Sequence, residues 1–392
     1  MIDINNRIIQ FCIVYTLALS FVISAESNER PQILWRVPIS HDGDVNGLIP
    51  LSIYKSGILC LGRNQQSPIL HMKEQNTGKN LWSWRDTTWN NLSSVRTNAY
   101  HIYQNILVFQ HSSKTYYINL NNGKLIREIA HKQTSTNTVV GAKSFYCFAA
   151  YSRSWCNFYA GNIKTGKEQM LVSMQITKKG ESVYPQTPKF VEYNNDLLLL
   201  LPFRRYDESL FLDQGFVTLY NFSRKKNIYT IPVNEISQYE AIQEPLVVNK
   251  KIYMTVGFSI VCHNLITGKQ LWRTKLPGDF MSSGIIYADG KIIGNCEDTN
   301  MYALDPENGK ILWREKTAGT SRTPFYMNGV AYLAGNGDGL LHAVDTKIGE
   351  HLWRVICPEK GDDSSFFGYV TGANGKIFVC SFSTLYCFKA AR

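Results

Sequence analysis

The sequence has little charge for its length and no dense cluster of charges. Charged residues make up 18% of 392 residues, and 41 lysines and arginines against 31 acidic residues leave a net charge of +10. The basic residues are scattered, so no segment resembles an arm that binds nucleic acid, and we predict no nucleic-acid partner. An anionic envelope surface fits the positive excess. A hydrophobic share of 44% excludes a disordered chain.

Long apolar runs are also scarce, because only Ile8 to Ile23 is long enough to resemble a targeting or anchoring segment. Arg7 precedes this run, and Ser24-Ala25 follows it as a small-residue cleavage site, so residues 1–25 are predicted to be a signal peptide. The mature chain is then periplasmic or secreted, and it is not an integral membrane protein. An uncleaved N-terminal membrane anchor is the alternative. Cys12 lies inside the run, which leaves no lipoprotein cleavage box.

Adjacent cysteines are absent, and none of the nine cysteines has the spacing of a zinc site. In an oxidising compartment, Cys147 with Cys156 and Cys380 with Cys387 are candidate disulfides across hairpins. Cys262 and Cys387, however, stand where other repeats have alanine, which favours small buried residues at these two positions.

What the sequence does have is a repeat. Four copies of Leu-Trp-Arg occur, with tryptophans at Trp35, Trp272, Trp313 and Trp353, and the last three are 41 and 40 residues apart. A fixed period in this range is typical of folds in which each unit is one supersecondary element.

The clearest unit runs from Gly284 to Lys316 and predicts four short strands. They are Gly284–Tyr287, Lys291–Cys296, Met301–Asp305 and Lys310–Lys316, separated by turns at Asp289-Gly290, Glu297 to Asn300 and Pro306 to Gly309. Four antiparallel strands in about forty residues form one blade of a β-propeller.

Eight such units can be counted from their first turns. These turns are predicted at Ser56-Gly57, Gln104-Asn105, Ala142-Lys143, Asn194-Asn195, Asn249-Lys250, Asp289-Gly290, Asn328-Gly329 and Asn374-Gly375. We therefore predict an all-β, eight-bladed propeller of four-stranded antiparallel blades over residues 26–392. The last blade lacks a strand, and the segment Ile33 to Ile39 is a lone fourth strand, so the N-terminal strand is expected to close the ring.

The repeated tryptophans and glycines are assigned structural roles. A large aromatic residue on the outer strand can fill the wedge between neighbouring blades, and a glycine four residues earlier makes the preceding turn. These structural repeat residues are Trp35, Trp82, Trp272, Trp313, Trp353, Gly268, Gly309 and Gly349. Arg127 and Met170 stand at the tryptophan position of the second and third blades, and the fourth blade has no glycine turn near Arg224-Lys225.

Two segments resemble the pyrroloquinoline-quinone (PQQ) type of propeller repeat. They are residues 338–345 with Gly349 and Leu352-Trp353, and residues 301–305 with Gly309 and Leu312-Trp313. Quinoprotein dehydrogenases of this family carry adjacent cysteines, a calcium site and a catalytic aspartate. No matching set occurs here, so we predict no enzyme activity, no cofactor and no catalytic or metal-binding residues.

In size, blade count and export, the chain is similar to the propeller lipoproteins of the outer-membrane barrel-assembly machinery, although it lacks their lipidation box. The resemblance implies a non-catalytic extracytoplasmic scaffold that binds protein partners through one loop face, in envelope assembly. The alternatives are a relative of the PQQ-dependent oxidoreductases and a protein that binds carbohydrate or the cell wall.

A partner-binding face is expected where the repeat is least regular, in the first four blades. Hairpins between second and third strands share a face with the links between blades, and insertions often mark the binding face of a repeat protein. Aromatic and arginine side chains, which are favoured at binding hot spots, gather in these segments. The predicted residues are Trp84, Arg85, Trp89, Arg96, Tyr151, Arg153, Arg204, Arg205 and Tyr206.

Overall fold

The protein is described from a computed structural model. It covers residues 31–38, 48–62, 69–87, 100–111, 113–132, 139–176, 180–233, 242–278, 283–319, 322–335, 337–358, 367–381 and 384–392. The predicted signal peptide lies outside these residues, as do Trp89 and Arg96.

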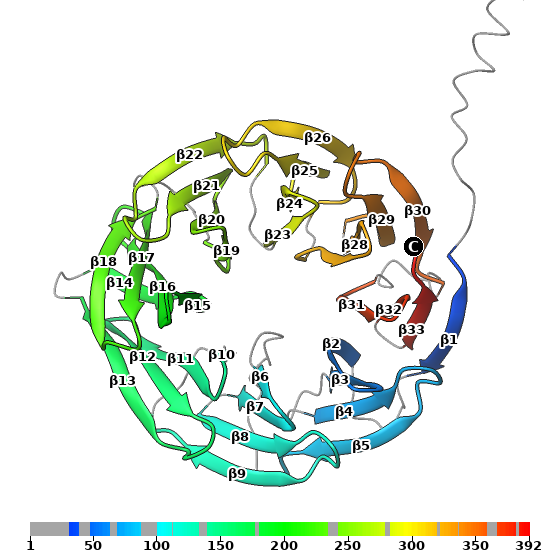
Figure 1. Cartoon of the computed structure of the whole chain (residues 1–392), viewed down its shortest axis with the longest axis horizontal. Coiled ribbons are helices and arrows are strands. Elements are labelled where there is room, and N and C mark those ends of the chain that lie inside the picture. Colours follow the sequence, from blue (N-terminus) through cyan, green and yellow to red (C-terminus); the bar gives the residue numbers. More distant parts are fainter. Residues whose placement is uncertain are drawn as a thin grey trace, which may run out of the picture.

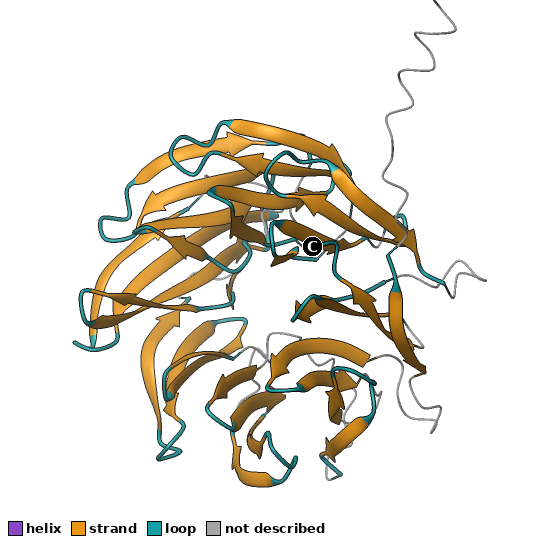
Figure 2. Ribbon diagram, turned by 45° about the vertical axis from the view of Figure 1, so that its right-hand side comes forward, coloured by secondary structure: helices purple, strands orange, loops and turns teal. Residues whose placement is uncertain are grey.

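Every regular element of the described residues is a β-strand, and the strands form eight sheets arranged in a ring (Figures 1 and 2). The prediction of an eight-bladed propeller is therefore confirmed. Blades 1 to 4 consist of β2 (Leu48–Tyr54), β3 (Gly57–Gly62), β4 (Ile69–Glu74) and β5 (Asn80–Arg85); β6 (Tyr100–Tyr103), β7 (Ile106–His111), β8 (Lys114–Asn119) and β9 (Leu125–Ala130); β10 (Val140–Ala142), β11 (Phe145–Ser152), β12 (Trp155–Asn162) and β13 (Glu168–Gln175); and β15 (Lys189–Tyr193), β16 (Asp196–Asp207), β17 (Leu212–Asn221) and β18 (Lys226–Pro232), with an added strand β14 (Glu181–Pro185).

Blades 5 to 8 follow the same order from the centre of the ring to its rim. They consist of β19 (Leu246–Val248), β20 (Lys251–Val256), β21 (Ser259–Asn264) and β22 (Gln270–Lys275); β23 (Ile285–Ala288), β24 (Lys291–Cys296), β25 (Asn300–Leu304) and β26 (Ile311–Lys316); β27 (Phe325–Met327), β28 (Val330–Ala334), β29 (Leu340–Asp345) and β30 (His351–Ile356); and β31 (Val370–Ala373), β32 (Lys376–Cys380), β33 (Thr384–Lys389) and β1 (Ile33–Pro38).

The N-terminal strand closes the ring, as predicted. Strand β1 pairs antiparallel with β33, so the start of the described chain completes the blade made by its end. Trp35 then donates a hydrogen bond across the next wedge, from its indole Nε1 to the carbonyl oxygen of Gln75 in blade 1, at 2.9 Å. The last blade is thus joined to the first by the same contact that joins interior blades.

The Leu-Trp-Arg tripeptide coincides with a β-bulge. In blade 5, Cys262 pairs with Trp272 and His263 pairs with Gln270, so Leu271 is the extra residue of the outer strand. A bulge bends its strand and redirects the next side chain. The same register shift occurs at the leucine of the other three copies, in β1, β26 and β30.

The indoles of Trp35, Trp82, Trp272 and Trp313 pack on the next blade. The indole of Trp272 donates from Nε1 to the carbonyl oxygen of Pro306, at 3.1 Å. Its ring also covers Gly309, where an added Cβ would lie 2.6 Å from the ring. Gly309 has a φ of +74°, so both the backbone and the neighbouring ring require glycine there. Trp35, Trp82 and Trp313 cover Gly78, Gly123 and Gly349 in the same way.

Blade 4 makes this contact with different residues. Tyr229 stands at the tryptophan position, opposite Leu219, and its hydroxyl donates to the carbonyl oxygen of Leu265 at 2.7 Å. Lys225 replaces the turn glycine and adopts the left-handed conformation, with a φ of +54°. The sequence predicts no glycine turn here, and it does not mark Tyr229 as an equivalent of tryptophan.

Two of the predicted first turns are displaced by one residue. Tyr54 pairs with Gly57 and Ala142 pairs with Phe145, so the turn residues are Lys55-Ser56 and Lys143-Ser144. Lys55 and Lys143 take positive φ values of 52° and 53° themselves. The glycine at position 57 is the first residue of β3 instead, and a Cβ there would lie 2.4 Å from Sδ of Met72.

The candidate disulfides are not formed. Cys147 lies opposite Ala160 and Cys156 lies opposite Tyr151, so these two cysteines do not face each other across their hairpin. Cys380 lies opposite Leu385 in the same way. None of the eight described cysteines forms a disulfide, and all eight are buried. Cys262 and Cys387 face Trp272 and Trp35, as Ala303 and Ala343 face Trp313 and Trp353, so the small residue makes room for the ring.

Candidate functional site

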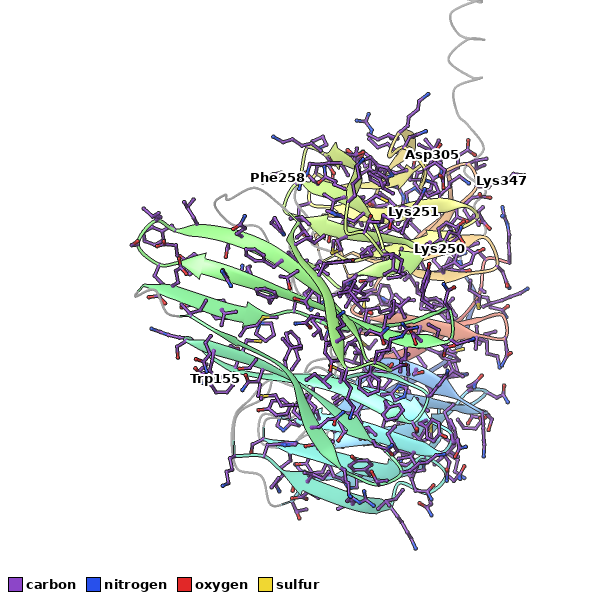
Figure 3. All side chains as sticks on the ribbon, turned by 60° about the vertical axis from the view of Figure 1, so that its left-hand side comes forward. Trp155, Lys250, Lys251, Phe258, Asp305 and Lys347 are labelled. Atoms are coloured by element: carbon purple, nitrogen blue, oxygen red, sulfur yellow. The ribbon has the colours of Figure 1, made fainter. Side chains whose placement is uncertain are left out.

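Two faces of the ring carry different turns. The hairpins between second and third strands, with Trp155 and Phe258 at their tips, point to one side in Figure 3. The other turns, marked by Lys250, Asp305 and Lys347, point to the opposite side. We call the first side the hairpin face.

Blades 3 and 4 project further on the hairpin face than their neighbours. Strands β16 and β17 are 12 and 10 residues long, against six residues each in β20 and β21 of blade 5. The link from blade 3 contributes β14, which pairs with the far half of β16 from Glu181 opposite Asp207 to Pro185 opposite Phe203. The predicted insertion at Arg204 is thus a long two-stranded arm that a third strand supports.

A stack of side chains joins this arm to blade 3. The rings of Tyr151 and Tyr184 meet edge to face with centroids 6.0 Å apart, and the guanidinium of Arg204 lies 5.6 Å from the centroid of Tyr184. Arg204 also forms an ion pair with the buried Asp213, at 3.1 Å. In the backbone, the amide of Val183 donates to the carbonyl oxygen of Arg153 at 3.1 Å. The structure therefore brings Tyr151, Arg153 and Arg204 together through β14.

The tip of the arm exposes apolar side chains. Leu210 and Phe211 are each 58% exposed, and Phe211 has a φ of +55°, which is rare for a bulky residue. Leu210 lines a hollow of about 220 Å³, and Arg205 and Tyr206 contribute to the same lining. We call the surface formed by Arg153, Arg205, Tyr206, Leu210 and Phe211 the arm platform. The sequence predicts its arginines and Tyr206 but not its apolar tip.

The predicted residues of blade 1 lie apart from the arm platform. Trp84 and Arg85 end the outer strand β5, and the ring of Trp84 packs edge to face on Tyr116 of blade 2, at 4.9 Å between centroids. Trp84 is only partly exposed, and Arg85 is exposed. Trp84 therefore contributes to packing between blades 1 and 2.

A pocket of about 360 Å³ opens elsewhere, between blades 2 and 3. Ala130, His131 and Lys132 line it from blade 2; Phe148, Ala150, Tyr159, Glu168, Gln169 and Met170 line it from blade 3. We call it the wedge pocket. The pocket lies where the bulge of the outer strand β13 is displaced. Tyr159 pairs with Met170 and Phe158 pairs with Val172, so Leu171 is the extra residue of β13. Met170 is consequently 56% exposed rather than packed like the tryptophans.

The polar end of the wedge pocket is a buried carboxylate. Glu168 accepts a hydrogen bond from the Tyr146 hydroxyl at 2.5 Å, and Nδ1 of His131 lies 3.4 Å from its other oxygen. Thr115 contacts Nε2 of His131 at 2.8 Å. Burial raises the pKa of Glu168 and lowers the pKa of His131. A cavity with convergent polar groups and perturbed pKa values is a typical ligand site.

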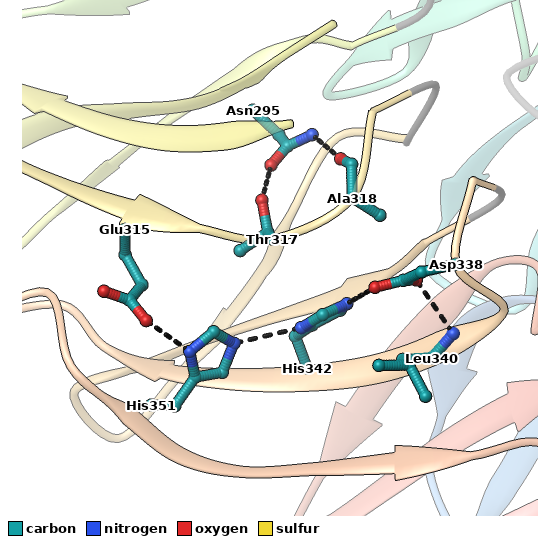
Figure 4. Close-up of polar contacts among 8 residues, drawn as sticks. All are labelled: Asn295, Glu315, Thr317, Ala318, Asp338, Leu340, His342 and His351. Atoms are coloured by element: carbon teal, nitrogen blue, oxygen red, sulfur yellow. Dashed lines mark hydrogen bonds and ion pairs between the residues drawn. The ribbon is translucent and has the colours of Figure 1, made fainter. Parts of the chain in front are cut away.

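A second polar chain joins blades 6 and 7 (Figure 4). Glu315 contacts His351 at 2.5 Å, His351 contacts His342 at 3.0 Å, and His342 contacts Asp338 at 3.0 Å. This series of polar side chains connects two blades, and none of its members lines either described pocket.

The described residues do not supply the groups that hold a quinone and its calcium ion in the dehydrogenases. The sequence has no adjacent cysteines. Within the described ranges, no three histidine, cysteine or acidic side chains gather as they would around a metal ion.

No helix in the described part of the chain is long and apolar enough to cross a bilayer.

Comparison with known proteins supports the repeat type. Residues 238–392, which include blades 5 to 7 and strands β31 to β33 of blade 8, match the family described as outer membrane protein assembly factor BamB. The quinone-dependent alcohol dehydrogenase subunit of Gluconobacter oxydans (strain 621H) is 30% identical over 153 residues, which is 31% of this chain and 20% of that protein. Tetrathionate hydrolase of Acidithiobacillus ferrooxidans is 28% identical over 131 residues, covering 29% of this chain and 26% of that protein. The chain thus spans about a quarter or less of these relatives.

Among solved structures, BamB from Moraxella catarrhalis is similar with a TM-score of 0.61 and 13% identity, covering 92% of this chain and 98% of that chain. Sqt1 from Saccharomyces cerevisiae has a TM-score of 0.62 and 10% identity, covering 92% and 99%. At these identities the likeness concerns the fold alone. Together with the repeats, these matches confirm the prediction of a PQQ-like propeller.

Proposed function

We propose that this chain, a PQQ-like β-propeller by its repeats and its fold, is a non-catalytic extracytoplasmic scaffold that binds a protein partner through its hairpin face. The observation that carries the proposal is the arm platform. Leu210 and Phe211 offer exposed apolar surface at its tip, and Arg205 lines the hollow with Leu210. Arg153 is exposed at the adjoining hairpin of blade 3. A few aromatic and arginine side chains supply most of the binding energy in protein interfaces.

The family match supports a role in the cell envelope. BamB is described as an outer membrane protein assembly factor, and the corresponding role for this chain is envelope assembly. The apolar segment before residue 26 supports export of the propeller over residues 26–392 as one domain. Uncleaved, this segment would anchor the propeller at the membrane.

The alternatives have weaker support. An oxidoreductase is favoured only by relatives that match about a third of the chain, and the described residues do not fit the cofactor. Binding of carbohydrate was suggested by Trp84 and Trp89, but the ring of Trp84 packs on Tyr116.

The test is charge reversal on the arm platform. Arg204→Glu is a poor choice, because it would place a carboxylate beside the buried Asp213. Arg153→Glu with Arg205→Glu changes exposed side chains only, and Lys347→Glu on the opposite face is the matched control. The proteins that co-purify from native envelope should lose at least one specific member with the double variant and none with Lys347→Glu. An identical set of partners for all three proteins would contradict the proposal.

A further inference from the structure

We propose that the wedge pocket binds a small organic ammonium compound, with the charged nitrogen at Glu168 and the carbon skeleton on Phe148 and Tyr159. This site is separate from the arm platform. Three features support the ammonium site: Glu168 has no permanent cation beside it among the described residues, the wall next to it is aromatic, and the cavity is small.

Glu168 is a buried carboxylate that meets no permanent cation within the described residues. Its side chain is 15% exposed, and its ion contact there is with His131. Burial lowers the pKa of His131, which keeps that imidazole neutral near pH 7. The Tyr146 hydroxyl donates a hydrogen bond to one oxygen of Glu168, and Nδ1 of His131 lies 3.4 Å from the other, whereas a carboxylate has about four acceptor positions. A buried charge without a counter-charge is costly, so an ammonium group that enters the pocket is favoured at Glu168.

The wall beside Glu168 is aromatic. Phe148 and Tyr159 stack with their ring centroids 5.2 Å apart and their planes at 13°, and the ring of His131 lies 5.1 Å from Phe148. Aromatic rings attract cations and bury the carbon skeleton of a ligand. Ala150 leaves space in the floor, and the exposed Lys132 lies at the mouth.

The size of the wedge pocket limits the ligand. A volume of about 360 Å³ is close to the lower end of the range for small-molecule sites, about 300–1,000 Å³. One ring or a short alkyl chain with one amine therefore fits better than a peptide or an oligosaccharide.

The experiment uses the full chain and two matched probes, benzylamine and benzyl alcohol, in calorimetry or ligand-observed NMR near pH 8. Benzylamine should bind with a Kd of about 1 mM or tighter, and benzyl alcohol about tenfold more weakly, because a hydrogen bond to a charged group is worth at least that factor. Equal affinity for the two probes, or no benzylamine binding up to about 10 mM, would overturn the proposal.

Substitution locates the binding. Glu168→Gln keeps the shape and removes the charge, so it should weaken benzylamine binding about tenfold and leave benzyl alcohol unchanged. Glu192→Gln is the control, because Glu192 is an exposed carboxylate with a side chain 64% accessible. Benzylamine affinity that survives Glu168→Gln would contradict the assignment. If Glu168→Gln misfolds, the native protein still decides: benzylamine affinity must fall as the pH drops and Glu168 takes up a proton. No such pH dependence would also refute the site.

Discussion

The contact between one blade's tryptophan and the next blade's glycine predicts a large and local loss of stability in Trp272→Ala. The side chain of Trp272 is 9% exposed, and its indole donates to Pro306. Removal of a buried tryptophan costs about 3–5 kcal/mol. The Pro306 carbonyl oxygen keeps a second donor in the variant, the Tyr253 hydroxyl at 3.1 Å, so no unpaired acceptor adds to this cost. We expect the free energy of unfolding to fall by about 3–5 kcal/mol.

The control lies one residue away. Leu271 is the bulge residue and is 44% exposed, so Leu271→Ala should cost less than about 1 kcal/mol. Guanidinium unfolding followed by tryptophan fluorescence and far-UV circular dichroism measures both variants, with the midpoints compared at an unchanged slope. Similar losses for the two variants would refute the argument that the bulge directs the tryptophan into the wedge.

Three further predictions follow from the fold. Deletion of residues 26–40, which removes β1 (Ile33–Pro38) and the Trp35 contact, should abolish cooperative melting; an unchanged melting transition would contradict closure of the ring. Burial lowers the pKa of His71 from 6.5 to about 4, so the unfolded state takes up the proton first as the pH falls. The free energy of unfolding should therefore fall by about 3 kcal/mol between pH 6.5 and 4. A His71→Gln protein that loses as much stability over this pH range as the native protein would refute this. Glu315→Ala leaves His351 without its carboxylate and should lower stability by about 1–3 kcal/mol in unfolding assays, whereas an exposed Glu350→Ala should change it little.

The regular part of the fold was predictable because it repeats. Turn glycines and the period of the tryptophans give the number of blades, and the lone strand at Trp35 gives the closure. The role of Tyr229 could not be predicted, because only the position of its hydroxyl shows that it replaces an indole. Lys225 likewise takes a backbone conformation that its side chain does not signal.

The candidate sites were predictable only in part. Arginines and aromatic residues in long connections indicated the hairpin face, but Tyr184, which joins them, lies in a link that has no periodicity. The wedge pocket depends on the placement of one bulge at Leu171, two residues later than the repeat suggests. Spacing from Gly166 therefore assigned Met170 to a wedge that its side chain does not fill.

The most direct test of the scaffold proposal is site-specific photocrosslinking in the native envelope. A photoreactive amino acid placed singly at Arg153, Arg205 or Leu210 probes the hairpin face, and the same residue at Lys250 or Lys347 probes the opposite face (Figure 3). We predict discrete protein adducts from the first three positions and none from the last two. Adducts from Lys250 and Lys347 alone, or equally from both faces, would contradict a partner that binds through the arm platform.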